Sequence, residues 1–202
     1  ANKSVAMGLK DFHTGTPKEL KEIDTPDCTS MEELATFLGV EKHKLAKTMI
    51  FKTMNGLVMA VVRGDHEVSR EKLTRYLGEP VLEKADQREV ERLGFVPGYL
   101  SPIGVNGTIP LVVDGTVAKS TNLIVGANKE GMHLKNANFG RDFESTNVAD
   151  ISMIKPENKC LQCGGPLQEV RALELGNIFK LDDFYSRSMG LYFQEENGKK
   201  VY

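Results

Sequence analysis

Two apolar runs separated by a turn dipeptide form the clearest pattern in the chain. The runs cover residues 48–54 and 57–62 and flank Asn55-Gly56, a dipeptide that readily takes the positive φ angles of a tight hairpin turn. The second run, LVMAVV, has no polar residue, which is typical of a strand buried on both faces of a sheet. The pattern predicts a β-hairpin in the middle of a sheet, followed by the polar run RGDHE at residues 63–67.

Capping residues and helical periodicity predict short helices around this hairpin. Ser30 and Glu33 have capping-box spacing before the apolar positions of residues 34–38, and Gly39 fits the left-handed position that follows a helix. The other expected helices cover residues 41–46, 69–76 and 86–93.

Further strands are expected beyond the irregular, Gly- and Pro-rich loop at residues 94–107. They cover residues 109–113, 123–125 and 132–134, with turns at Asp114-Gly115 and residues 128–131. Several of these turns are too short for crossover helices. The chain is therefore predicted to be α+β, with a mixed, partly antiparallel sheet and packed helices.

The composition and the apolar pattern of the sequence change near both ends. Residues 1–25 mix charge, Gly and Pro without apolar periodicity, which indicates a linker or docking arm. The main domain is expected at residues 26–155. Residues 156–202 begin with a polar, turn-rich, Cys-containing segment and include two expected strands, at 169–175 and 178–181.

Composition narrows the class of protein. The chain has 26 Lys and Arg against 28 Asp and Glu, a net charge of −2, which argues against indiscriminate coating of nucleic acid but leaves room for a local basic patch that holds an RNA end. No apolar run reaches the roughly 18 residues that span a bilayer, and no signal peptide opens the chain. We therefore expect a cytoplasmic protein with no membrane partner.

Six segments, in order, carry a family resemblance. KTMIFK, VVRGDHEV, GYLSP, PLVVDGTV, IVGANKEGMH and GRDF resemble the editing domain inserted into bacterial-type prolyl-tRNA synthetases, a branch of the YbaK-like aminoacyl-tRNA deacylases. The match covers roughly residues 25–154 and implies the barrel-like sheet of that fold. The tail, from CLQCGGPL to DDFYSRSMG, resembles the passage where the synthetase chain re-enters its class II core.

The resemblance implies an activity and partners. The activity is hydrolysis of the ester that joins a wrong amino acid, chiefly alanine, to the acceptor end of the proline-specific tRNA. Editing would need no cofactor, whereas the ligase core, absent here, would use ATP and Mg²⁺ and form a homodimer. The remaining partner is the rest of the synthetase chain. Two alternatives stay open, a freestanding trans-editing deacylase and a non-catalytic tRNA-binding module.

Five residues are the implied catalytic set. Lys47 matches the lysine beside the ester, Gly98 and Pro102 match the GxxxP loop, Asp114 could bind the substrate ammonium, and His133 follows the GAN segment. The matched region has no Cys beyond Cys28 and no Ser-His-Asp order, which is consistent with attack by water assisted by the ribose 2′-hydroxyl. The structural alternatives are a solvated lysine, ordinary turns and a core histidine.

Other polar groups are expected to be structural. The consecutive residues Asp65-His66-Glu67 suggest a metal or acid/base cluster, but neighbours at a strand end point in different directions, which favours turn chemistry. A surface salt bridge is favoured over an RNA contact for Arg63, and Arg141 is expected to pair with Asp142. The candidate pocket walls, for which core packing is favoured, are Met49, Phe51, Val61 and Leu123.

Cys160-x-x-Cys163-Gly-Gly resembles half of a zinc knuckle. A closed zinc site needs four ligands, and the only other cysteine, Cys28, is far away in sequence. We therefore expect no metal and two reduced thiols in a loop, with a zinc site completed by other groups as the alternative.

Overall fold

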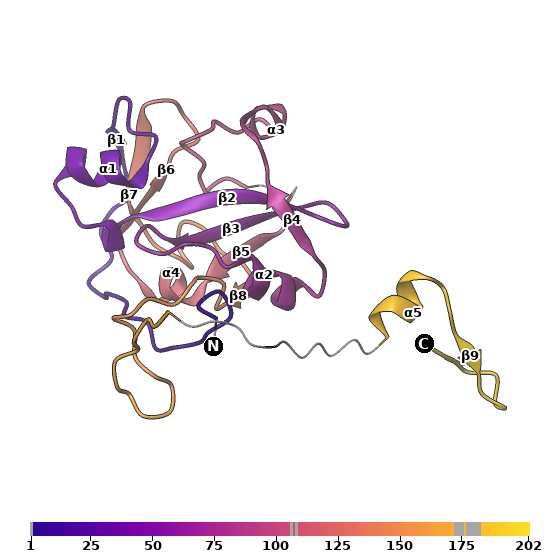
Figure 1. Cartoon of the computed structure of the whole chain (residues 1–202). Helices are drawn as coiled ribbons and strands as arrows, with labels where there is room; N and C mark the ends of the chain where they lie inside the picture. The colour runs from indigo at the N-terminus through magenta and orange to yellow at the C-terminus, as the bar shows by residue number, and fades with distance from the viewer. Residues whose placement is uncertain (1, 106, 108, 172–175, 177–182) are drawn as a thin grey trace. The chain divides into compact units, whose positions relative to one another are not determined.

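The computed structural model describes residues 2–105, 107, 109–171, 176 and 183–202 (Figure 1). The chain divides into two compact units, Ala1–Glu169 and Val170–Tyr202. The elements of the first unit are β1 (Lys21–Asp24), α1 (Met31–Leu38), the 3₁₀ helix η1 (Lys42–Lys44), β2 (Ala46–Thr53), β3 (Leu57–Arg63), α2 (Arg70–Leu77), β4 (Val81–Lys84), α3 (Gln87–Arg92), β5 (Leu111–Asp114), α4 (Gly115–Lys119), β6 (Leu123–Gly126), β7 (Met132–Ala137) and β8 (Asn147–Ala149). Those of the second are α5 (Phe184–Ser188), β9 (Phe193–Gln194) and β10 (Lys200–Val201).

Two sheets organise the first unit. A five-stranded sheet has the order β4-β2-β3-β5-β8, with β2 antiparallel to β3 and β4, while β5 is parallel to both β3 and β8. A three-stranded antiparallel sheet has the order β1-β7-β6, and a parallel bridge between Leu45 and Ile124 joins the two sheets. The predicted α+β fold with a mixed sheet is confirmed.

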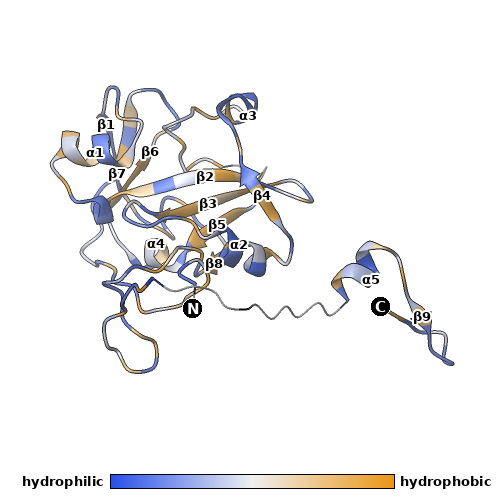
Figure 2. Cartoon of the chain, in the orientation of Figure 1, coloured by the Kyte–Doolittle hydropathy of each residue, from blue (hydrophilic) through white to orange (hydrophobic). Residues whose placement is uncertain are grey.

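Strand β3 is buried on both faces, as its apolar sequence predicts, and lies between β2 and β5 (Figures 1 and 2). The alternation of side chains along a strand sends its residues into different cores. Val58, Ala60 and Val62 pack in the cluster that contains Leu73 of α2. On the other face, Met59 packs in the cluster of α3, and Val61 in that of α4 and β6.

The predicted capping box at the start of α1 is present. The Glu33 N–H donates to Ser30 Oγ at 3.2 Å, and the Ser30 N–H donates to Glu33 Oε2 at 2.9 Å. Gly39 ends the helix with φ 62°, in the left-handed region. This fixed helix start holds the preceding residue, Thr29, at the edge of the pocket described below.

Two local predictions are wrong, each for its own reason. The helix expected at residues 41–46 is only the 3₁₀ turn of η1, since Ala46 already pairs with Arg63 in the hairpin. Asp114-Gly115 is not a turn between strands, because Asp114 caps α4 by accepting from the Thr116 N–H at 2.9 Å.

Several strands lie where the sequence shows no strand pattern. The first 25 residues, expected to be a linker or docking arm, include β1, which pairs with β7. The same segment contains Lys10, whose side chain is 6% exposed and pairs with Asp150. Strands β4 and β8 were also not predicted; both lie at the ends of the five-stranded sheet. Of the strands expected at residues 169–175 and 178–181, residues 169–171 are not in a strand, and residues 172–175 and 178–181 lie outside the described residues.

Candidate functional site

A pocket of about 280 Å³ lies where the start of α1, strand β2, the 98–100 loop and the ends of β6 and β7 meet. Three of the five predicted catalytic residues, Lys47, Gly98 and His133, line it although they are far apart in sequence. The other lining residues are Thr29, Met31, Glu32, Ala46, Thr48, Met49, Glu67, Lys84, Leu100 and Gly126.

Lys47 places in the pocket the cationic group that the sequence motif predicts. Its side chain is 15% exposed and its ammonium pairs with the carboxylate of Glu67, which is 71% exposed. An ion pair with so exposed a carboxylate contributes little stability, so a substrate anion can replace Glu67 at little cost. The sequence predicts Glu67 only as part of a turn. In the structure Glu67 lines the pocket, whereas Asp65 and His66 do not.

His133 is a buried, neutral imidazole in the pocket wall. It is 2% exposed, its Nδ1 lies 2.6 Å from Thr25 Oγ1, and its ring is tilted against that of Tyr99 with centroids 5.4 Å apart. Burial lowers the pKa of His133 to about 4. At neutral pH the ring therefore offers a hydrogen bond without a charge that would repel a substrate ammonium.

The loop that carries Gly98 is held by the segment after β6. Asn128 Oδ1 accepts from the Val96 N–H, and the Asn128 N–H donates to the Tyr99 carbonyl, both at 2.7 Å. A Cβ on Gly126 would lie 2.3 Å from the Tyr99 carbonyl oxygen, so only glycine allows this approach. Gly98 itself has φ 83°, which also favours glycine. These contacts hold the Gly98 backbone at the pocket.

Asp114 and Pro102 do not line this pocket. Pro102 lines a separate cavity of about 430 Å³. Asp114 is 1% exposed, and its Oδ2 accepts from the N–H groups of Ile151 and Ser152 at 3.1 and 3.0 Å. Burial alone would raise the pKa of Asp114, but the Lys10 charge and hydrogen bonds from Thr116 hold it below its usual value. Its carboxylate fastens α4 to the 150–152 segment.

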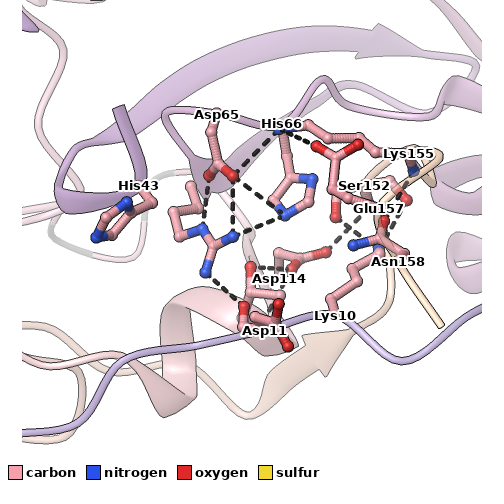
Figure 3. A network of polar contacts seen from close by, with 12 residues as sticks. Lys10, Asp11, His43, Asp65, His66, Asp114, Ser152, Lys155, Glu157 and Asn158 are labelled. Carbon is pink, nitrogen blue, oxygen red and sulfur yellow. Dashed lines mark hydrogen bonds and ion pairs between the residues drawn. The ribbon is translucent and has the colours of Figure 1, made fainter. Parts of the chain in front are cut away.

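Asp65 and His66 belong to a separate polar network (Figure 3). Arg63 is not on the surface, as its predicted surface salt bridge requires, because it is only 6% exposed. Its guanidinium donates two hydrogen bonds to the Asp65 carboxylate, of 2.6 and 2.9 Å. Lys155 also reaches Asp65, at 3.1 Å, and Arg63 Nη2 lies 3.3 Å from His66 Nε2. Burial alone would raise the pKa of Asp65, but Arg63 and Lys155 hold it well below its usual range. The network joins the hairpin end to the 150–158 segment, and the structural role of Asp65 and His66 stays a prediction.

The remaining sequence predictions concern an ion pair, the pocket walls, a metal site and a membrane span. Arg141 pairs with Asp142 at 2.7 Å, as predicted. Of the candidate pocket walls, Met49 lines the pocket, while Phe51, Val61 and Leu123 pack in the cores. Within the described residues no group of three or more His, Cys, Asp or Glu side chains is arranged to hold a metal ion. No helix among these residues is both long and apolar enough to cross a membrane.

Comparison with known proteins assigns the family. Residues 25–143 match the model of the aminoacyl-tRNA editing domain, and this segment contains Lys47, Gly98 and His133. The chain belongs to the aminoacyl-tRNA editing domain family. The predicted resemblance to an editing domain of prolyl-tRNA synthetases is confirmed.

Relatives of this editing domain are synthetases. The chain is 42% identical over 187 residues to a proline–tRNA ligase of Thermoanaerobacter sp., with 91% of the chain and 32% of the ligase covered. It is 44% identical over 183 residues to that of Desulforamulus reducens, with 90% and 32% covered. The editing domain chain therefore spans about a third of the length of these relatives.

Solved structures share the fold of the editing domain. One neighbour is a protein proposed to be a trans-editing enzyme for prolyl tRNA synthetase, with a TM-score of 0.55 and 22% identity over 66% of this chain and 86% of its own. A second, a hypothetical protein, has a TM-score of 0.57 and 25% identity over 66% of this chain and 91% of its own.

Proposed function

We propose that this chain is the cis-editing part of a prolyl-tRNA synthetase and hydrolyses alanine from mischarged tRNA(Pro) in the Lys47 pocket. The proposal places it in the cytoplasm, within a larger homodimeric enzyme whose ATP- and Mg²⁺-dependent core joins proline to the same tRNA. The observation that carries the proposal is the convergence of Lys47, Gly98 and His133 on one pocket of about 280 Å³.

The pocket offers the groups that ester hydrolysis requires. An aminoacyl ester is already reactive toward water, so positioning and modest charge stabilisation are sufficient for catalysis. In the proposed complex Lys47 leaves Glu67 and holds the terminal phosphate or ribose, while N–H groups of the Gly98 loop bind the ester carbonyl. The ribose 2′-hydroxyl assists the attacking water, and neutral His133 hydrogen-bonds the substrate.

Steric exclusion supplies the specificity in this proposal. A pocket at the low end of the usual size range for small-molecule sites can admit the alanine methyl group and reject the larger proline ring. Discrimination against glycine or serine is weaker, because a difference of one small group is worth only about 1–3 kcal/mol. The apolar side chains available to set this limit are those of the lining residues Met31, Ala46, Met49 and Leu100.

The test is a deacylation assay with tRNA(Pro) charged with alanine, glycine, serine or proline. We expect release of alanine and retention of proline. High enzyme concentration is needed in the assay, because the chain spans only about a third of the related ligases and the regions that bind the rest of the tRNA can lie elsewhere. Binding of Ala-tRNA(Pro) with no hydrolysis at any concentration would instead establish a non-catalytic binding module.

The distinction between cis and trans editing needs a separate observation. The genomic reading frame around this chain should continue into a class II synthetase core. A stop codon directly after Tyr202 would contradict the cis assignment and leave a freestanding deacylase.

A further inference from the structure

The turn that contains Cys160 and Cys163 does not line the Lys47 pocket. Its geometry places two thiols close together. Residues 159–166 form a tight hairpin closed by an antiparallel bridge between Lys159 and Pro166. The Cys160 N–H donates to the Gly165 carbonyl at 2.8 Å, and the Gly164 N–H donates to the Cys160 carbonyl at 3.0 Å. These bonds fix the backbone on both sides of the cysteine pair.

Backbone N–H groups of the turn point at the first sulfur. The Gln162 N–H donates to Cys160 Sγ at 3.4 Å. Hydrogen bonds from the N–H groups of Cys163 and Gln162, and from the Cys163 thiol, lower the pKa of Cys160. The Cys163 thiol therefore lies within hydrogen-bonding reach of a sulfur whose pKa is lowered.

Cys160 and Cys163 are both at least partly exposed, unlike the third cysteine. Cys163 is exposed and Cys160 is partly exposed, and both are free thiols. Cys28 is 4% exposed, and burial raises the pKa of its thiol. A cysteine of lowered pKa beside an accessible second thiol is the arrangement of reactive dithiol sites.

We propose that Cys160 and Cys163 form a thiol–disulfide exchange site that reacts with small-molecule disulfides, with Cys160 as the attacking group and Cys163 as the resolving group. A closed zinc site is the competing use of two such thiols. It needs four ligands, and across the described part of the chain no third His, Cys, Asp or Glu joins the pair. The donor set therefore favours dithiol chemistry.

The exchange proceeds in two balanced steps. The Cys160 thiolate attacks one sulfur of the reagent disulfide, whose S–S bond breaks, so that a mixed disulfide forms on Cys160 and one thiolate leaves. The Cys163 thiol then loses its proton to water, and its sulfur attacks that of Cys160, releasing the second thiolate. Overall the protein dithiol loses two electrons and two protons, and the reagent disulfide is reduced to two thiols.

Oxidised glutathione is the probe, and the 202-residue chain is the reactant. We expect mass spectrometry to show an intramolecular disulfide in the unmodified chain, reversed by reduced glutathione. Cys163→Ser should accumulate a single glutathione adduct on Cys160. In Cys160→Ser, Cys163 should react at least about threefold more slowly than Cys160 does in Cys163→Ser. Cys28→Ser is the matched control and should behave as the unmodified chain does.

Two results would overturn the proposal. Equal rates for Cys160→Ser and Cys163→Ser would show two ordinary exposed thiols with no directed exchange. One equivalent of zinc in the purified chain, released only when both thiols are blocked, would identify the turn as a metal-binding site. Neither readout depends on deacylation, so the result is independent of the proposed editing function.

Discussion

The hydroxyl oxygen of Thr25 lies 2.6 Å from Nδ1 of His133, and both residues are buried. Thr25 follows β1 directly, and His133 is opposite Ile23 in the pairing of β1 with β7. The β1–β7 pairing thereby sets the orientation of the imidazole in the pocket wall. The segment at residues 21–25, which shows no strand pattern in the sequence, is thus part of the support of the site.

The buried histidines make stability depend on pH. The pKa of His133 and that of His66 are each lowered to about 4 from 6.5 by burial. Between these two pH values the unfolded chain binds protons that the folded chain does not. The free energy of unfolding therefore falls as pH decreases from about 6.5 to about 4, by at most about 1.4 kcal/mol per pH unit for each histidine.

Urea unfolding measured across this pH range checks the effect. His133→Gln should reduce the slope of unfolding free energy against pH by about one proton's contribution, and His66→Gln should do the same independently. A slope unchanged in both variants would show that the two rings do not account for the acid sensitivity.

Lys47→Ala should abolish deacylation while the fold remains intact, because it removes the cation assigned to the phosphate or ribose. A loss of about a hundredfold or more in kcat/KM is expected from losing one such group. The matched control is Lys52→Ala, on the same strand: Lys52 pairs with Glu83 and Glu89 at 3.0 and 2.6 Å outside the pocket. Unchanged deacylation in Lys47→Ala would remove this residue from the mechanism.

Asn128→Ala should impair deacylation although the side chain does not line the pocket, because the Val96 N–H loses its acceptor and the Gly98 loop loosens. A displacement of about 1 Å can cost about a hundredfold in rate. Asn128→Asp keeps the acceptor and should retain most activity. Asn128→Gly allows the φ of 52° without the side-chain bond, so activity equal to wild type in this variant would show that only the backbone conformation matters.

Gly126→Ala should displace the same loop from the other side. The new Cβ would lie 2.3 Å from the carbonyl oxygens of both Tyr99 and Leu100, so the backbone has to move. We expect lower deacylation and destabilisation of about 1–3 kcal/mol by thermal unfolding. Gly115→Ala is the control: nothing lies within 4 Å of its Cβ position in α4, and we expect unchanged activity with equal or higher stability. Equal behaviour of the two variants would contradict the close approach.

Much of the fold follows from short-range pattern. The Asn55-Gly56 hairpin and the Ser30 capping box were predicted correctly because each depends on residues within a few positions of one another. Lys47 was identified from a motif that lies on the hairpin itself.

The assembly of the pocket depends on contacts that no local pattern encodes. Lys47 and Glu67 are 20 positions apart, and Thr25 and His133 are 108 positions apart. Sheet pairing and core packing decide such contacts, because they close long loops whose ends carry no local signal. The same packing buries Asp114 against the 150–152 segment, away from Lys47. The residue types of the site can thus be read along the chain, whereas their convergence is set by how the two sheets pack.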